Sequence, residues 1–120
     1  MNKINIGVDF SPDPSGRFCT DGDSSGEKFR ENYLKPAIND LQEGASIEII
    51  LDDGVEGYGS SFLVEGFAGM VKHGYISSDE LLKKMKFSYD DEDFEFYEKK
   101  IIDYVTQAVF DTEKYVPTTK

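Results

Sequence analysis

Residues 47–69, IEIILDDGVEGYGSSFLVEGFAG, combine an apolar run, a glycine-rich turn and a segment with helical periodicity. The run from Ile47 to Leu51 predicts a strand that is covered on both faces of a sheet. After the turn, Ser60 or Ser61 is suited to cap a helix. The following apolar residues recur at helical spacing, at Leu63, Phe67, Met70 and Val71. This order predicts a βα unit whose helix begins where open α/β sheets usually have their binding sites.

The segments before this unit predict a strand, a hairpin and a helix. Ile4, Ile6 and Val8 alternate within residues 2–9, which predicts a first strand, and residues 17–20 predict a short second strand that pairs with it. Ser24 and Glu27 have the spacing of a capping box, so a helix should start there and end near Gly44. Pro36 should kink or break that helix, because proline lacks a backbone donor.

The segments after the central unit predict two helices separated by a brief strand. His73 and Gly74 should end the central helix, and Ser77 and Glu80 form a second capping box for a helix over 79–85. A strand is expected at 86–89. The last helix follows an acidic cluster, and its apolar stripe consists of Phe94, Tyr97, Ile101, Tyr104, Val105 and Ala108. We therefore expect one α/β domain over residues 1–112 and a flexible tail over 113–120.

Composition limits the classes of partner and chemistry. The 120 residues carry a net charge of −11, which disfavours direct binding to nucleic acid or to an anionic membrane. The single cysteine, Cys19, rules out an internal disulfide and favours a cytoplasmic location, and the sequence shows neither a membrane span nor a signal peptide. The histidine and acidic residues match no metal-binding or cofactor motif, so neither a metal nor a cofactor is expected.

Two segments carry a resemblance to a known family. Residues 16–38, GRFCTDGDSSGEKFRENYLKPAI, and residues 57–71, GYGSSFLVEGFAGMV, resemble the two signature stretches of the STAS-like family of small bacterial and phage-borne proteins. STAS stands for sulphate transporter and anti-sigma factor antagonist. We name these stretches the first and second signature segments. The resemblance implies a mixed β-sheet packed against helices in a single domain.

The resemblance also implies a candidate regulatory serine. In anti-sigma factor antagonists, a serine in an Asp-Ser-Ser-Gly turn after the central strand is phosphorylated by a partner kinase. Ser60 falls on the serine position, whereas Gly59 replaces the aspartate and Phe62 replaces the glycine. Ser60 therefore has two interpretations, a helix cap and a phosphosite.

Charged residues in the two segments are candidates for an ion pair. Glu65 lies one turn into the central helix, close to its apolar stripe, so a partly buried carboxylate there would need a partner. Arg17 or Arg30 of the first signature segment could be that partner and form a bidentate ion pair with the carboxylate. We expect either a structural or a ligand-lining ion pair that joins the two segments, with a solvent-exposed glutamate as the alternative.

These observations favour a regulatory protein over an enzyme. One histidine and one cysteine leave a catalytic set without a recognisable base. We expect a non-enzymatic module that resembles an anti-sigma factor antagonist and binds a signalling, kinase-like or defence protein. Its expected contact residues are Tyr58, Gly59, Ser60, Ser61 and Phe62. The alternative is an acidic inhibitor that mimics nucleic acid, of the kind that phages or mobile elements encode, and blocks a basic nucleic-acid-binding partner.

Overall fold

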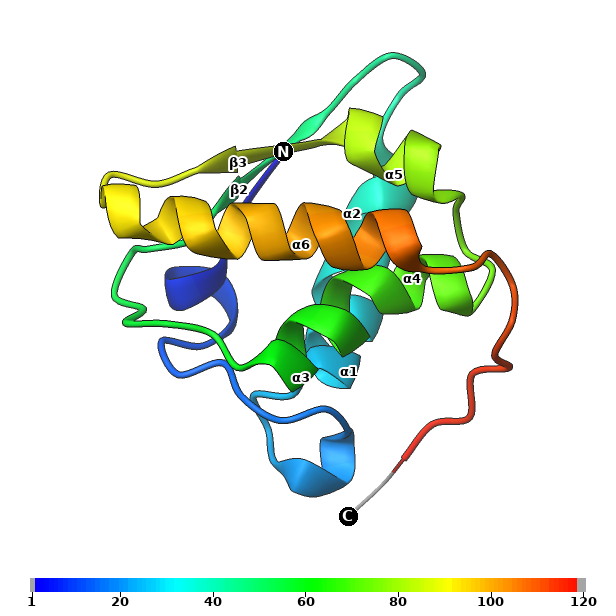
Figure 1. Ribbon diagram of the computed structural model, residues 1–120, viewed down its shortest axis with the longest axis horizontal. Coiled ribbons are helices and arrows are strands. Elements are labelled where there is room, and N and C mark those ends of the chain that lie inside the picture. Colours follow the sequence, from blue (N-terminus) through cyan, green and yellow to red (C-terminus); the bar gives the residue numbers. More distant parts are fainter. Residues whose placement is uncertain (1, 119–120) are drawn as a thin grey trace.

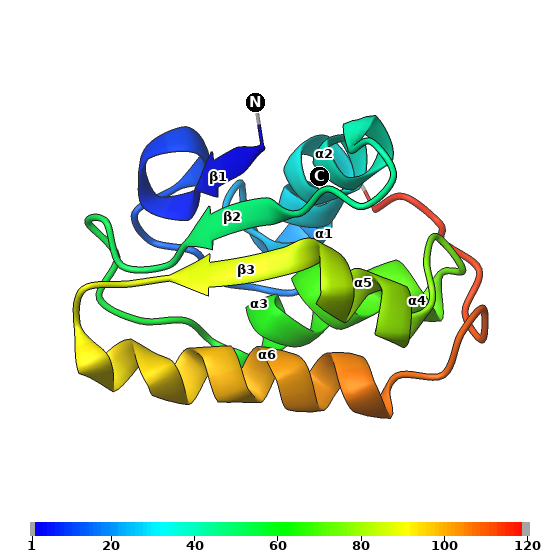
Figure 2. The same ribbon diagram turned by 90° about the horizontal axis from the view of Figure 1, so that it is seen from above.

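The computed structural model describes residues 2–118 and contains a sheet of three strands in the order β1-β2-β3. The strands are β1 (Lys3–Asn5), β2 (Ile47–Ile50) and β3 (Met85–Ser88), and both pairs are parallel. Figure 2 shows the strands side by side, and Figure 1 shows helices gathered on one side of them. The predicted α/β class is confirmed, but the sheet described here is parallel and not mixed.

The N-terminal hairpin predicted from the sequence is absent from the described residues. β1 ends at Asn5 because the chain turns into a single π-helical turn, η1 (Ile6–Phe10). The Asn5 side chain caps this turn by accepting a hydrogen bond from the Val8 N–H at 3.3 Å. Residues 17–20 do not form a strand, because Cys19–Asp21 is a short 3-10 helix, η2.

The sheet has one buried and one partly exposed face. On the buried face lie Ile4, Ile47, Ile49, Leu51 and Met85. On the other face, Lys3 pairs in register with Glu48, and Glu48 with Lys86, so opposite charges alternate across the three strands. The prediction that the central strand is covered on both faces is therefore wrong.

The first crossover is one helix with an irregular middle. It consists of α1 (Gly26–Phe29), the π-helical segment η3 (Arg30–Leu34) and α2 (Lys35–Asp40). Its cap is Ser25, whose hydroxyl accepts a hydrogen bond from the Lys28 N–H at 3.2 Å, and not Ser24 as the capping-box pattern predicts. The π-helical segment ends two residues before Pro36, which explains the predicted irregularity, since π-bulges commonly kink helices. The helix ends at Asp40, before Gly44.

The second crossover begins with the central helix. It consists of α3 (Ser60–Leu63), the π-helical segment η4 (Val64–Ala68) and α4 (Gly69–Lys72). The predicted apolar stripe is confirmed, because Leu63, Phe67, Met70 and Val71 are all buried. The helix ends at Lys72 with His73 as its C-cap, and Gly74 follows with a φ of 78°, a conformation that favours glycine.

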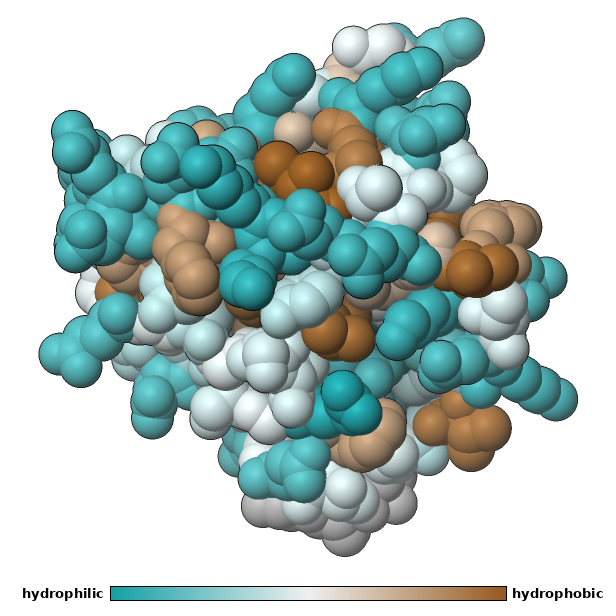
Figure 3. Space-filling view, in the orientation of Figure 1, coloured by the Kyte–Doolittle hydropathy of each residue, from teal (hydrophilic) through white to brown (hydrophobic). Residues whose placement is uncertain are grey.

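The remaining elements complete the layer of helices. α5 (Ser78–Lys84) is capped by Ser77, and the 3-10 helix η5 (Glu92–Phe94) leads into α6 (Glu95–Gln107). The stripe of α6 buries Ile101 and Val105, and Figure 3 shows mainly hydrophilic side chains on the face over this helix. Within residues 2–118, no helix is long and apolar enough to span a membrane.

The chain after α6 folds back onto the domain (Figure 1). Residues 111–118, which we name the C-terminal strap, start with N–H groups of Asp111, Thr112 and Glu113 that donate to the carbonyls of Val71 and Lys72. The strap includes most of the segment that the sequence assigns to a flexible tail. The last two residues of that tail, and Met1 of the predicted domain, lie outside the described residues.

Candidate functional site

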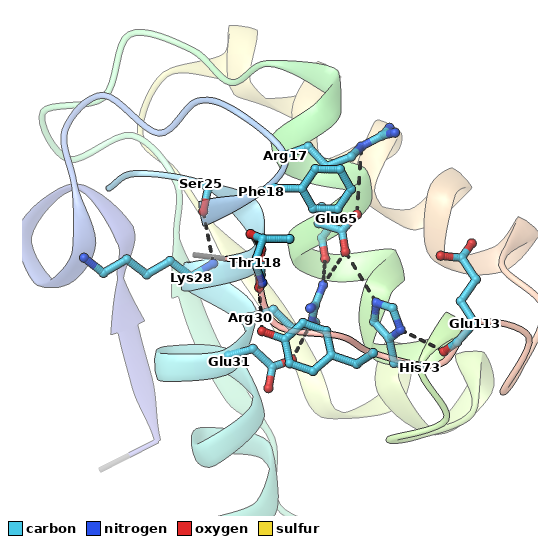
Figure 4. A network of polar contacts seen from close by, with 12 residues as sticks. Arg17, Phe18, Ser25, Lys28, Arg30, Glu31, Glu65, His73, Glu113 and Thr118 are labelled. Carbon is cyan, nitrogen blue, oxygen red and sulfur yellow. Dashed lines mark hydrogen bonds and ion pairs between the residues drawn. The ribbon is translucent and has the colours of Figure 1, made fainter. Parts of the chain in front are cut away.

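A close contact between two helices brings the two signature segments together. A Cβ atom on Gly26 would lie 2.6 Å from the Phe62 carbonyl oxygen and 2.9 Å from the Gly66 nitrogen. Because glycine has no side chain at this point, the helix that starts at Gly26 can approach the central helix this closely. The approach places Arg30 of η3 directly against Glu65 of η4 (Figure 4).

Arg30 is fully buried and bound by carboxylates from both helices. Its Nη1 lies 2.6 Å from Glu65 Oε2 and 2.8 Å from the Glu65 carbonyl oxygen, and its Nε lies 2.7 Å from Glu31 Oε2. Burial alone would lower the pKa of Arg30, but the two ion pairs outweigh it and raise the pKa. Nη2 is buried without a hydrogen-bond partner among the described residues. Arg30 is therefore an anchor with one unused donor group.

The Glu65 carboxylate also lies close to two further basic side chains. Its Oε1 lies 3.8 Å from Nε of Arg17, which is half-exposed, and its Oε2 lies 3.4 Å from Nε2 of His73. The other ring nitrogen of His73, Nδ1, lies 2.9 Å from the carbonyl oxygen of Glu113 in the strap. Thus the structure brings Arg17, Arg30 and Glu65 together, and it adds His73, which the sequence did not link to this cluster (Figure 4).

A second buried carboxylate, Glu27, was assigned from the sequence only to a helix cap. Its side chain accepts hydrogen bonds from the Cys19 N–H at 2.9 Å, from the Tyr115 hydroxyl at 2.5 Å and from the Thr118 N–H at 3.0 Å. The Thr118 hydroxyl donates as well. Burial alone would raise the pKa of Glu27, but these hydrogen bonds lower it to about 2. No sequence signal could have linked Glu27 to Tyr115 and Thr118, because 88 and 91 positions separate them.

Cys19 lies beside this carboxylate. Burial and the nearby Glu27 charge raise the pKa of the Cys19 thiol, so the thiolate form is disfavoured. Among residues 2–118, no group of three or more histidine, cysteine, aspartate or glutamate side chains could hold a metal ion.

The predicted contact residues divide into buried and exposed ones. Tyr58 and Phe62 are buried, with ring centroids 5.8 Å apart, and the Tyr58 hydroxyl donates to the Leu51 carbonyl at 2.6 Å. Burial also raises the pKa of the Tyr58 phenol. Tyr58 and Phe62 are therefore core residues, and Tyr58 is not the exposed anchor that the sequence suggests.

The serines after the turn are exposed. Gly59 is the N-cap residue of α3, and no side chain caps this helix, so the predicted capping role of Ser60 or Ser61 is wrong. Gly59, Ser60 and Ser61 are all exposed. Neither serine hydroxyl forms a hydrogen bond within the described part of the chain.

A pocket of about 230 Å³ lies beside Ser60, between the central helix and α6. Phe96, on α6, is more than half exposed at 58%. The pocket is lined largely by aromatic rings and has one basic group, with Tyr58, Ser60, Leu63, Phe96, Tyr97, Lys100 and Tyr104 as its residues. It could receive an apolar side chain of a partner, and the sequence did not identify α6 as part of this surface.

Acidic residues from separate segments meet at the carboxyl ends of the strands. Asp52 Oδ2 accepts hydrogen bonds at 2.8 Å from the N–H groups of both Asp90 and Asp91. Asp53 accepts a hydrogen bond from Asn5 Nδ2, also at 2.8 Å. Asp52, Asp53, Asp90 and Asp91 line an open hollow of about 640 Å³. These acids therefore form one surface, although they come from different parts of the sequence.

Comparison with known proteins identifies a family and nothing more specific. Neither the curated proteins nor the solved structures include a significant match. A family model described as a STAS-like domain of unknown function (DUF4325) matches residues 25–94, which run from the cap of the first crossover helix to η5. This match covers more than half of the chain and includes both Arg30 and Glu65. The chain belongs to the STAS-like domain family.

Proposed function

We propose that this protein is a non-enzymatic regulatory module that binds a signalling or kinase-like protein. The proposed contact face consists of the turn over 57–59, the exposed serines at the start of α3 and the neighbouring pocket on α6. The observation that carries this proposal is the aromatic pocket beside Ser60, which joins an exposed Phe96 to the second signature segment.

The exposed serine hydroxyls support a regulatory role for the same face. Ser60 does not cap the helix, so its hydroxyl is free to be modified, and the N-terminus of the helix would favour a phosphate there. A phosphate would also place negative charge at the rim of the pocket. We therefore propose Ser60 as the phosphosite that controls partner binding.

The side chains that could act as catalytic acids or bases are bound to one another, which supports a non-catalytic role. Arg30, Glu65 and His73 hold one another in a largely buried cluster, and Glu27 is occupied by the strap. A catalytic acid or base must reach the proton that it transfers. In this arrangement the groups stabilise the junction of two helices.

Affinity purification of the full-length chain from its native host, followed by mass spectrometry, tests the proposal. Phe96→Ala and Ser60→Asp should each remove the signalling or kinase-like partner, because they alter the wall and the rim of the pocket. Val8→Ala is the matched control, since Val8 is 67% exposed, slightly more than Phe96, but lies in η1. Recovery of the same partner with all three variants would refute the proposed face. Tyr58→Ala would be uninformative because Tyr58 is a core residue.

A second candidate function is inhibition of a basic nucleic-acid-binding protein. The acidic surface at the carboxyl ends of the strands favours it, because aspartates from two loops converge there and the protein carries a net charge of −11. Neutralising the exposed acids Asp90, Glu92 and Asp93 should then abolish partner capture, and added DNA should compete with the protein. Under the first candidate, the same variant should keep its partner.

A further inference from the structure

The C-terminal strap lies across a charged surface at the junction of the two signature segments. We name this surface the groove, and it consists of Glu27, Arg30, Glu65, Val71, Lys72 and His73. Tyr115 and Thr118 bind Glu27 of the first crossover helix, while Glu113 contacts His73 at the end of the central helix. The ring of Tyr115 covers Arg30, with its centroid 4.9 Å from Cζ. The strap therefore spans both helices and shields the Arg30–Glu65 ion pair (Figure 4).

Few contacts hold the strap in place. Glu113, Lys114, Val116 and Pro117 are exposed, and Val116 is 68% exposed. The strap is attached by the three N–H groups at residues 111–113, by the contacts of Glu113 with His73 and of Tyr115 with Arg30, and by the donors that Tyr115 and Thr118 offer to Glu27. Segments with so few buried apolar contacts open at low free-energy cost.

The groove has the chemistry of a site for an extended peptide. Carbonyls of Val71 and Lys72 accept hydrogen bonds from main-chain N–H groups, and the Glu27 carboxylate accepts from two hydroxyls and one N–H of the strap. Main-chain hydrogen bonds supply affinity in such sites, and side-chain contacts supply selectivity. Nη2 of Arg30, whose guanidinium lies under the Tyr115 ring, is buried without a hydrogen-bond partner among the described residues.

The groove lies within the residues matched by the family model, and the strap does not. Glu27, Arg30, Glu65, Val71 and His73 all lie within the matched residues 25–94, whereas the strap lies outside them. The receiving surface thus lies within the matched residues, and the segment that covers it lies outside them.

We propose that this groove is a docking site for an extended segment of a partner protein, and that the strap is an intramolecular competitor for it. The segment recognised would carry a tyrosine and, three residues later, a threonine, in the spacing of Tyr115 and Thr118. A second copy of this chain is a less suitable occupant, because two molecules of net charge −11 repel each other. This site is separate from the pocket beside Ser60, which has no residue in common with it.

The test measures binding of a fluorescent synthetic peptide with the sequence of residues 109–120, VFDTEKYVPTTK, to the full-length protein by fluorescence anisotropy. The wild type should bind weakly, because its own strap competes at an effective concentration in the mM range. The double variant Tyr115→Phe, Thr118→Val loses both hydroxyl donors and should bind the peptide at least about tenfold more tightly. Val116→Ala is the matched control and should bind like the wild type, since Val116 is exposed in the same strap.

A second peptide separates specific docking from general adhesion. A peptide with phenylalanine and valine in place of the tyrosine and threonine should bind the double variant at least about tenfold more weakly than the native sequence. Equal binding of the two peptides, or equal affinity of wild type and double variant for the native peptide, would overturn the proposal. Concentration-dependent dimerisation of the double variant without peptide would instead assign the groove to a second copy, and would also overturn it.

Hydrogen exchange of the wild type provides a readout that does not depend on folding of the variant. Millimolar peptide should speed exchange of the amides at residues 111–113, because the peptide displaces the strap, and should leave amides of the sheet protected. Unchanged exchange at those three amides would contradict displacement. In the affinity purification, loss of the partner with Phe96→Ala but not with the double variant Tyr115→Phe, Thr118→Val would assign that partner to the pocket beside Ser60 and not to the groove.

Discussion

Arg30 Nη1 lies 2.6 Å from Glu65 Oε2, and this ion pair joins two helices that both lie within the residues matched by the family model. Arg30 is fully buried, and the Glu65 side chain is only 14% exposed. A charge removed from water to this degree requires a charged partner, because desolvation of an unpaired ion costs several kcal/mol. The pair therefore fixes the relative position of the helices as well as their contact.

Glu65→Gln should destabilise the fold by about 3 kcal/mol, because it leaves the buried Arg30 with one carboxylate in place of two. Urea unfolding followed by circular dichroism measures this change in the free energy of unfolding. Glu95→Gln is the control, since Glu95 pairs with Lys99 at 3.8 Å on an exposed part of α6 and such pairs contribute less than about 1 kcal/mol. Equal effects of the two substitutions would contradict a stabilising role for the buried pair.

The sequence predicts this part of the site because its information is local. Helical spacing places Arg30 and Glu65 on amphipathic helices, and a glutamate near an apolar stripe implies a basic partner. The strap could not be found in this way, because Tyr115 and Thr118 are ordered by one distant carboxylate and not by periodicity. For the same reason Tyr58 was misplaced, since its burial depends on rings of α6 and η5 that only the tertiary fold supplies.

The errors in the sheet also have local causes. The alternation of Ile4, Ile6 and Val8 predicts a longer strand, but the Asn5 side chain and the Asp9 carboxylate bind nearby N–H groups and stabilise a turn instead. The prediction of a hairpin then followed from the assumed strand. The central strand is short and apolar, and its period cannot show whether a second layer covers it.

Gly26→Ala should destabilise the protein by about 1–2 kcal/mol. The steric strain of an added Cβ at a close contact outweighs the stabilisation from the better helix propensity of alanine. The new Cβ would lie 2.6 Å from the backbone oxygen of Phe62, which cannot move as a side-chain end could. Gly59→Ala is the matched control, since its Cβ would meet no atom within 4 Å. Thermal unfolding of the two variants should show a lower melting temperature for Gly26→Ala alone, and the reverse order would refute the helix contact.

Ser25→Ala should cost about 1 kcal/mol, because Ser25 is buried and caps the first crossover helix. Ser60→Ala should change the free energy of unfolding by less than about 0.5 kcal/mol, because Ser60 is exposed and caps nothing. Urea unfolding of both variants distinguishes the cap from the proposed phosphosite. A loss of about 1 kcal/mol in Ser60→Ala would restore the capping interpretation.

The binding of the strap to Glu27 should make stability depend on pH in the acidic range. The pKa of Glu27 is lowered from 4.5 to about 2 in the folded protein, so the native state favours the carboxylate. The stability that Glu27 contributes is therefore fully present above its unfolded pKa, and it is lost as the pH falls from about 4.5 towards 2. Glu27→Gln should be less stable than the wild type at pH 7, and the difference between the two should shrink below pH ~4.5.

Urea unfolding of both proteins at several pH values between 7 and 3 measures that difference directly, and other titrating groups largely cancel from it. Asp103→Asn, which removes an exposed carboxylate of α6, serves as the control for the loss of one negative charge outside the strap. Hydrogen exchange of the amides at residues 111–113 should accelerate over the same pH interval, relative to sheet amides, because protonated Glu27 can no longer accept every donor of the strap. Parallel stability curves for wild type and Glu27→Gln would show that the strap is held by other contacts.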